Sequence, residues 1–294
     1  MAKQDYIIAT DACSDIIPFY ADEEDVRVVP MEVTMTDGTK FDATYDMDLD
    51  WFYDRIRNGA FAQTSAITPQ RYFDFVTPLL EAGHDILYNC FTSGMSSTYS
   101  NACMAAEIFR ERYPERKFCV VDSLSATGGQ GYHTYFAARN RDKGMPIEEN
   151  AKWLEETRRH VQCTWTVDDL MHLNRGGRLS KTAAIFGTAL QIKPVGDIDD
   201  EGCLVSIGKV RGRKQALHHL CNVLVNTLDD PEKNPVLICH CSCPNDAEAL
   251  KQMVLETGKV SEVIIGRTGP VVGTHLGPSG LTMFYFCNKR IASL

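Results

Sequence analysis

Short apolar runs that alternate with helix-forming segments constrain the fold of this chain more than any other feature. Residues 6–10 read YIIAT, residues 85–91 read DILYNCF and residues 117–123 read KFCVVDS, and a helix-forming segment follows each run. Strands that are apolar throughout, rather than at every second residue, are typical of parallel sheets covered by helices on both faces. The sequence therefore predicts an α/β protein whose N-terminal part holds a mostly parallel sheet with helices on both faces.

The pattern changes near residue 165. Residues 191–210, QIKPVGDIDDEGCLVSIGKV, contain two extended runs around a polar turn, which predicts a hairpin, and further helix and strand signals follow. We therefore predict two α/β domains. The N-terminal domain spans residues 1–165, and the C-terminal domain spans residues 166–294 and contains a mixed sheet.

Composition and charge limit the classes of partner. The chain has 294 residues, 44% of them hydrophobic, and a formal net charge of −9, which argues against nucleic-acid binding because phosphate backbones require basic residues. Its eleven cysteines show no disulfide-framework spacing and no signal peptide precedes them, which favours free thiols in a reducing cytosol. No run approaches the roughly 18 apolar residues of a membrane span, so we expect a cytoplasmic protein without an integral membrane segment.

Two further motifs suggest cofactors at first sight. Cys239, Cys241 and Cys243 of ICHCSCP alternate along a predicted strand, so they share one face, and the paired C-x-x-C spacing of zinc sites is absent. Residues 126–131, ATGGQG, lack the lysine of a phosphate-binding loop. We therefore expect the cysteines to belong to the core, and we predict neither a metal nor a cofactor.

Residues 93–99, SGMSSTY, place several hydroxyl groups on the turn that leaves the strand at 85–91 and enters a helix. One interpretation is a nucleophilic serine, because α/β-hydrolases expose theirs on a sharp turn of this kind. Their G-x-S-x-G motif requires a second glycine, and Thr98 stands in its place. A serine hydrolase that acts on lipid esters is therefore kept as an alternative.

A binding site is the other interpretation of these hydroxyls. The N-terminus of a helix offers unpaired N–H groups and partial positive charge, and hydroxyls there can donate to a carboxylate or phosphate. Capping by Ser96 or Ser97 would explain the same residues without a ligand. A second hydroxyl cluster, TSAIT, also precedes a helix, and it leaves Thr64 and Ser65 for a ligand if Thr68 is the cap.

Two glycine-rich segments supply candidate partners for an anion. In NRGGRLSK, residues 174–181, two arginines flank a glycine pair, and arginine can grip a carboxylate or phosphate through two parallel bonds. The same segment is also compatible with a helix end on the surface. In GTHLGPSG, residues 273–280, His275 lies among glycines in a loop, which favours a functional role.

Residues 208–217, GKVRGRKQAL, concentrate basic side chains in an acidic protein. Lys209, Arg211, Arg213 and Lys214 lie within six residues. Such a patch can meet an acidic partner or a phosphate, or it can simply be a solvated surface.

Taken in order, these segments together with TDACSD, VDSLSATGGQG and GPVVGTHLGPSGL resemble the DegV family over nearly the whole chain. The resemblance implies a bacterial two-domain α/β protein that binds a long-chain fatty acid between its domains. The best understood relatives are the fatty-acid-binding subunits of fatty acid kinase.

The resemblance also implies roles for individual residues. The fatty-acid carboxylate is expected at Thr64 and Ser96, with Ser65 beside the first and Ser93 as a second choice for the serine. Arg178 and His275 are expected nearby. Arg211, together with Arg213 of the same segment, is expected at the interface with a kinase.

The predicted function is therefore fatty-acid binding without catalysis by this chain itself. The bound fatty acid would be presented to a separate ATP-dependent kinase subunit, which makes acyl phosphate for phospholipid synthesis. Burial of the carboxylate requires hydrogen bonds or a paired charge, while the tail contributes about 0.8 kcal/mol per buried CH₂. A fatty-acid carrier without a kinase partner is the first alternative, and the lipid-ester hydrolase is the second.

Overall fold

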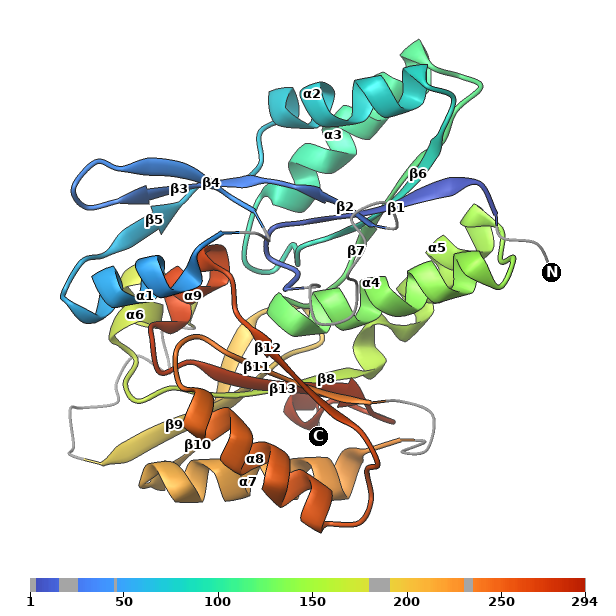
Figure 1. The fold of residues 1–294 in the computed structure, drawn as a ribbon. Helices are drawn as coiled ribbons and strands as arrows, with labels where there is room; N and C mark the ends of the chain where they lie inside the picture. The colour runs from blue at the N-terminus through green and yellow to red at the C-terminus, as the bar shows by residue number, and fades with distance from the viewer. Residues whose placement is uncertain (1–3, 16–25, 45–46, 180–190, 230–234, 294) are drawn as a thin grey trace.

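A computed structural model describes residues 4–15, 26–44, 47–179, 191–229 and 235–293. Within these residues the strands form three sheets, and helix α4 (Thr127–Asp142) lies between the two larger ones (Figure 1). This one helix therefore packs against both large sheets.

The first sheet is parallel, with the strand order β2-β1-β6-β7. Its strands are β1 (Tyr6–Asp11), β2 (Val26–Val29), β6 (Asp85–Cys90) and β7 (Phe118–Asp122). Helices α2 (Pro69–Glu81) and α3 (Thr98–Arg112) pack on one face, while α4 and α5 (Ile147–Thr157) pack on the other (Figure 1). The predicted parallel sheet with helices on both faces is confirmed.

A small antiparallel sheet extends beside the first one. Its order is β4-β3-β5, with β3 (Met31–Met35), β4 (Lys40–Ala43) and β5 (Ala62–Thr64), and helix α1 (Leu49–Arg57) connects the last two strands. Thr64 is the last residue of β5, and Thr68 caps α2 by accepting from the Arg71 backbone N–H at 3.3 Å. The cap leaves Thr64 and Ser65 outside the helix, as the sequence predicts.

The other large sheet is mixed, with the order β10-β9-β8-β13-β11-β12. Its strands are β8 (Val161–Thr166), β9 (Ile192–Ile198), β10 (Leu204–Arg211), β11 (Val236–His240), β12 (Val263–Arg267) and β13 (Leu281–Phe286). Strands β11 and β12 run parallel, and the other neighbouring pairs run antiparallel. The predicted mixed sheet and the predicted β9–β10 hairpin are both confirmed.

Helices cover this mixed sheet as well. They are α7 (Arg213–Thr227) and α8 (Pro244–Glu256). Helices α6 (Met171–Gly176) and α9 (Pro270–Leu276) pack on each other, and α9 also contacts β3 and β5 of the small sheet. Short 3₁₀ turns lie at Arg158–His160 and Ile291–Ser293. The sequence-based division at residue 165 falls inside β8, which pairs with β13 and β9. This division stays a prediction.

The glycines of ATGGQG have a packing role. Helix α4 contacts β1 and β6 of the parallel sheet and β13, β11 and β8 of the mixed sheet. A Cβ atom on Gly128 would lie 2.7 Å from the Cys239 sulfur, and one on Gly129 would lie 2.9 Å from the Phe284 ring. These contacts leave no room for a side chain, so the glycines allow α4 to touch both sheets closely.

Cys239 and Cys241 are fully buried in the hydrophobic core, as the sequence predicts, whereas Cys243 is only partly buried and packs against a second cluster. All eleven cysteines are free thiols. The described residues contain no group of three or more acidic, histidine or cysteine side chains placed to hold a metal ion. No helix in the described part of the chain has the length and hydrophobicity needed to cross a membrane.

Candidate functional site

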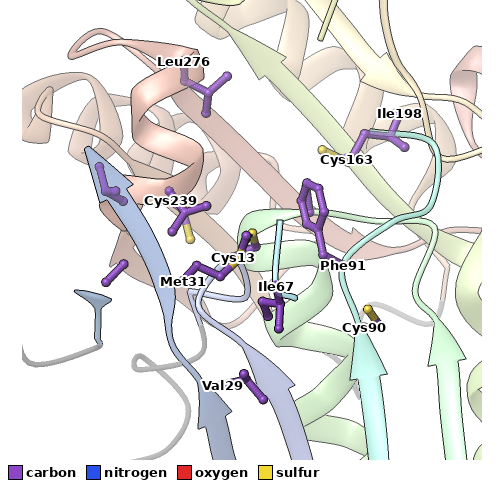
Figure 2. Close-up of a cluster of buried hydrophobic side chains, with 14 of the residues drawn as sticks. Cys13, Val29, Met31, Ile67, Cys90, Phe91, Cys163, Ile198, Cys239 and Leu276 are labelled. Carbon is purple, nitrogen blue, oxygen red and sulfur yellow. Dashed lines mark hydrogen bonds between the residues drawn. The ribbon is translucent and has the colours of Figure 1, made fainter. Parts of the chain in front are cut away.

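A cavity lies between the carboxyl ends of the parallel strands and the mixed sheet. Its volume is about 60 Å³, so its walls lie close together. Both halves of the chain line it. Cys13, Met31 and Phe91 come from the N-terminal half, and Cys163, Ile198 and Leu276 come from the C-terminal half (Figure 2).

Most of the wall of this cavity is apolar, and the polar group of its largest side chain is bonded within the protein. Trp165 is fully buried, and its Nε1 donates to the Asp197 carbonyl oxygen at 3.0 Å. Its ring is then left to line the cavity. Gly196 lies against this ring so closely that no side chain would fit there. The arrangement suits an apolar ligand without hydrogen-bonding groups along its length.

Thr64 and His275 form a polar pair at one end of the apolar cavity. Thr64 ends β5. His275 lies in the last turn of α9, so the loop predicted at this histidine is wrong and begins only at Gly277. The Thr64 Oγ1 and His275 Nε2 atoms are 3.0 Å apart. Burial lowers the pKa of His275 to about 4, and the charge of Arg178 acts in the same direction. The imidazole is therefore neutral at neutral pH, with one nitrogen to donate and one to accept.

The glycine pair of NRGGRLSK shapes this polar end. A side chain on Gly176 would collide with the His275 ring, and Gly177 has a φ of +66°, which favours glycine. The chain can therefore leave α6, pass the imidazole closely and turn back at once. Residues 180 and 181 of the same motif lie outside the described residues.

Arg178 follows the glycine pair and lines the cavity. Its Nε donates to the Met95 carbonyl oxygen at 3.4 Å, and its Nη1 donates to the Gly176 carbonyl oxygen at 2.5 Å. It forms no ion pair with any residue that the structure describes. A cation held in place by carbonyl groups, without a carboxylate, is suited to receive an anionic ligand.

The serines predicted for the site separate into two groups. Ser65 and Ser96 line the cavity, and the Ser96 Oγ accepts from the Thr98 backbone N–H at 3.1 Å. Ser96 therefore serves the start of α3 and faces the cavity as well. Ser93 is exposed and does not line the cavity, and its backbone N–H donates to Asp122 at 3.1 Å.

The geometry lacks the pair of residues that a serine nucleophile needs. The Ser96 Oγ bonds to the Thr98 Oγ1 at 2.9 Å, and His275 bonds to Thr64. No described histidine lies within hydrogen-bond distance of Ser96, so no base is in place to accept its proton. The arrangement favours binding over hydrolysis.

The two arginines predicted to dock a partner differ from each other. Arg211 is exposed at the end of β10. Arg213 is partly buried, forms a 2.9 Å ion pair with Asp246 and donates to the Ser279 carbonyl oxygen at 2.7 Å. Neither lines the apolar cavity, and Arg213 connects α7 to its neighbours within the fold.

A family model for the DegV family matches residues 6–288. The chain belongs to the DegV family. A DegV domain-containing protein of Clostridium perfringens is 33% identical to this DegV protein over 287 residues, which cover 97% of this chain and 98% of the relative.

Solved structures of DegV proteins share the fold. A DegV family protein from Thermus thermophilus, described by its fatty acid binding, has a TM-score of 0.86 at 26% identity and covers 97% of this chain and 100% of its own. The Streptococcus pneumoniae Fatty Acid Kinase (Fak) B3 protein, loaded with linoleic acid, has a TM-score of 0.84 at 21% identity with the same coverage. At that identity the second likeness shows the fold alone.

Sequence reasoning missed the apolar lining of the DegV cavity. Trp165, Phe91 and Leu173 line it, yet in the sequence they read as ordinary core residues. No signal separates the two roles, because a tunnel wall and a core have the same composition. The sequence predicts the polar end of this cavity, where hydroxyl, arginine and histidine side chains gather, and not its walls.

Proposed function

We propose that this protein binds one long-chain fatty acid, with the carboxylate at the Thr64 end of the cavity and the tail along the apolar walls. One observation carries the proposal. An apolar cavity between the sheets ends at hydroxyl groups, a neutral histidine and an arginine without an acidic partner among the described residues. A fatty acid has the same division into a charged end and an apolar tail.

The hydrogen bonds at this end have a consistent direction. If His275 Nε2 donates to Thr64, then the Thr64 hydroxyl is free to donate to the carboxylate, and Ser96 can donate from the other side. Arg178 supplies the positive charge that a buried carboxylate requires. The tail adds about 0.8 kcal/mol for each buried CH₂, so binding needs no further polar contact.

We also propose that a separate ATP-dependent kinase phosphorylates the bound carboxylate, with this chain as the binding subunit and not the catalyst. The likeness to the Streptococcus pneumoniae Fatty Acid Kinase (Fak) B3 protein supports this role, as does the resemblance of the sequence motifs. The free cysteines support a cytoplasmic location. The function in cells is then supply of acyl phosphate for phospholipid synthesis.

Native mass spectrometry of the purified protein, followed by solvent extraction, tests the binding proposal. We expect one long-chain fatty acid per chain. Titration of the delipidated protein should show that Thr64→Val weakens binding by about 10-fold to 100-fold, because a hydrogen bond to a charged group is lost. A protein that neither carries a fatty acid nor binds one after delipidation would contradict the proposal.

Thr34→Val is the matched control for this experiment. Thr34 lies on β3 and pairs with Gln63, the residue before Thr64 in β5. Its side chain does not line the apolar cavity. The substitution makes the same chemical change in a neighbouring strand, so fatty-acid affinity should stay unchanged.

The two alternatives have their own tests. A carrier without a kinase partner would bind fatty acid but yield no acyl phosphate with a bacterial fatty acid kinase and ATP. A lipid-ester hydrolase would be labelled at Ser96 by a fluorophosphonate probe, which we do not expect because Ser96 has no base among the described residues.

A further inference from the structure

A second, polar cavity lies against the first. Thr64, Arg178 and His275 line both cavities, so the Thr64–His275 pair forms part of the wall between them. Phe61, His172 and Arg175 line the second cavity and not the first. A ligand atom beside the Thr64 hydroxyl is therefore close to both the apolar space and this outer, polar space.

Two arginines give the outer cavity its charge. Arg175 and Arg178 both line it, and neither forms an ion pair with an acidic side chain in the part of the chain that the structure describes. Among the described residues, no carboxylate lies within ion-pair distance of either guanidinium group. Such a pair favours an anion that carries more than one negative charge.

Contacts within the fold hold Arg175 at the cavity. Its guanidinium carbon lies 3.2 Å from the centroid of the Phe61 ring, and the His172 ring lies 5.7 Å from the same ring. The flat face of the guanidinium stacks on the ring, while its N–H groups point outward from its own edge and can still donate hydrogen bonds. Arg178 is held by two carbonyl groups, and its Nη2 has no hydrogen-bond partner among the described residues.

We propose that the outer cavity is a subsite for the phosphoryl group of an acyl phosphate, held by Arg175 and Arg178 while the acyl chain stays in the apolar cavity. The inference rests on the proposed function, because it places the carboxylate at Thr64. In the reaction a carboxylate oxygen forms a bond to the γ-phosphorus of the kinase's nucleoside triphosphate, and the bond from that phosphorus to the diphosphate oxygen breaks. The new group carries its charge away from the apolar cavity and toward the two arginines.

A (2-oxoalkyl)phosphonate is a stable probe for this subsite, since a CH₂ group replaces the labile bridging oxygen of the acyl phosphate. Titration calorimetry of the delipidated protein with this phosphonate and with the fatty acid of matching chain length compares the two sites. We expect Arg175→Gln to weaken phosphonate binding by about tenfold and to change fatty-acid binding by less than about twofold. Arg175→Lys, which keeps the charge without the planar fork, should give an intermediate phosphonate affinity.

Arg112→Gln is the matched control, because Arg112 is an exposed arginine that stacks on Phe73 and lines neither cavity. It should change neither affinity. Equal effects of Arg175→Gln on both ligands, or no effect on the phosphonate, would overturn the inference. If the unchanged protein binds fatty acid but not the phosphonate, the subsite alone is wrong, whereas failure to bind either ligand contradicts the proposed function itself.

Discussion

Asp15 is a buried carboxyl group at the junction of three segments. It has a φ of +45°, accepts from the Gly269 backbone N–H at 2.8 Å, and is bonded by the Thr127 hydroxyl. Burial raises its pKa to about 7, although these hydrogen bonds lower it. The folded protein therefore holds a proton on Asp15 at pH values where the unfolded chain has released it.

The pH dependence of stability follows from this difference. Between about pH 4 and pH 7 the folded state binds more protons than the unfolded state, so the free energy of unfolding falls as pH rises. The contribution of Asp15 is about 1.4 kcal/mol per pH unit within that window. Asp15→Asn should remove this contribution, and urea denaturation across the window measures the difference in slope. The exposed Asp74→Asn is the control, and equal slopes for Asp15→Asn and the unchanged protein would show that Asp15 is ionised when folded.

At the scale of single residues, the sequence predicts polar groups better than apolar ones. The polar residues of the site are predictable because each stands out chemically from its neighbours in the sequence. The structure places four of them around one cavity: Thr64, Ser96, Arg178 and His275. Ser93 resembles Ser96 in the sequence, yet it is exposed, since the turn carries its side chain away from the cavity. The direction of a side chain on a turn depends on backbone angles that residue type alone does not determine.

The turn between β6 and α3, residues 91–97, is in direct contact with the β9–β10 hairpin. This contact joins the two halves of the chain. Thr92 Oγ1 donates to the Gly202 carbonyl oxygen at 2.9 Å, and a Cβ atom on Gly94 would lie 2.6 Å from the Glu201 carbonyl oxygen. The hairpin also supplies Ile198 and Leu204 to the cavity wall. The position of this hairpin therefore affects both the fold and the ligand site.

Gly94→Ala should separate these two elements. The new methyl group meets backbone atoms that cannot move independently, so we expect a loss of about 1–3 kcal/mol in the free energy of unfolding. Fatty-acid affinity should fall as well, because the cavity wall shifts. Thermal denaturation and fatty-acid titration measure the two effects. Gly208→Ala is the control within the same hairpin, since its Cβ atom would lie 3.4 Å from Val195, and similar results for both variants would argue against a tight junction at Gly94.

At the scale of elements, the sequence predicts the strands that are apolar throughout, but it does not predict short polar strands. Strand β5 has the sequence AQT, which carries no apolar pattern, and it forms because β3 pairs with it. Helix α4 shows a related limit. The need for Gly128 is visible only when the mixed sheet is present, because the atoms that exclude a side chain there come from Cys239, Leu237 and Phe284.

For the molecule as a whole, docking of a kinase should depend on charges outside the cavities. Arg211 is exposed, while Arg213 is engaged with Asp246 and Ser279. We therefore expect Arg211→Ala to leave stability and fatty-acid affinity unchanged and to slow acyl-phosphate formation by the kinase. Arg213→Ala should instead lower the free energy of unfolding by about 1–2 kcal/mol, since it leaves partly buried acceptors unpaired.

Salt dependence separates docking from a general loss of positive charge. A charge at the rim of an interface accelerates association, so the advantage of the unchanged protein over Arg211→Ala should shrink as ionic strength rises. Arg27→Ala, which removes an exposed arginine from β2, is the matched control and should not slow the kinase reaction. If Arg211→Ala is phosphorylated at the unchanged rate at low salt, the kinase approaches through another face, and the two arginines of the outer cavity become the next charges to test at that interface.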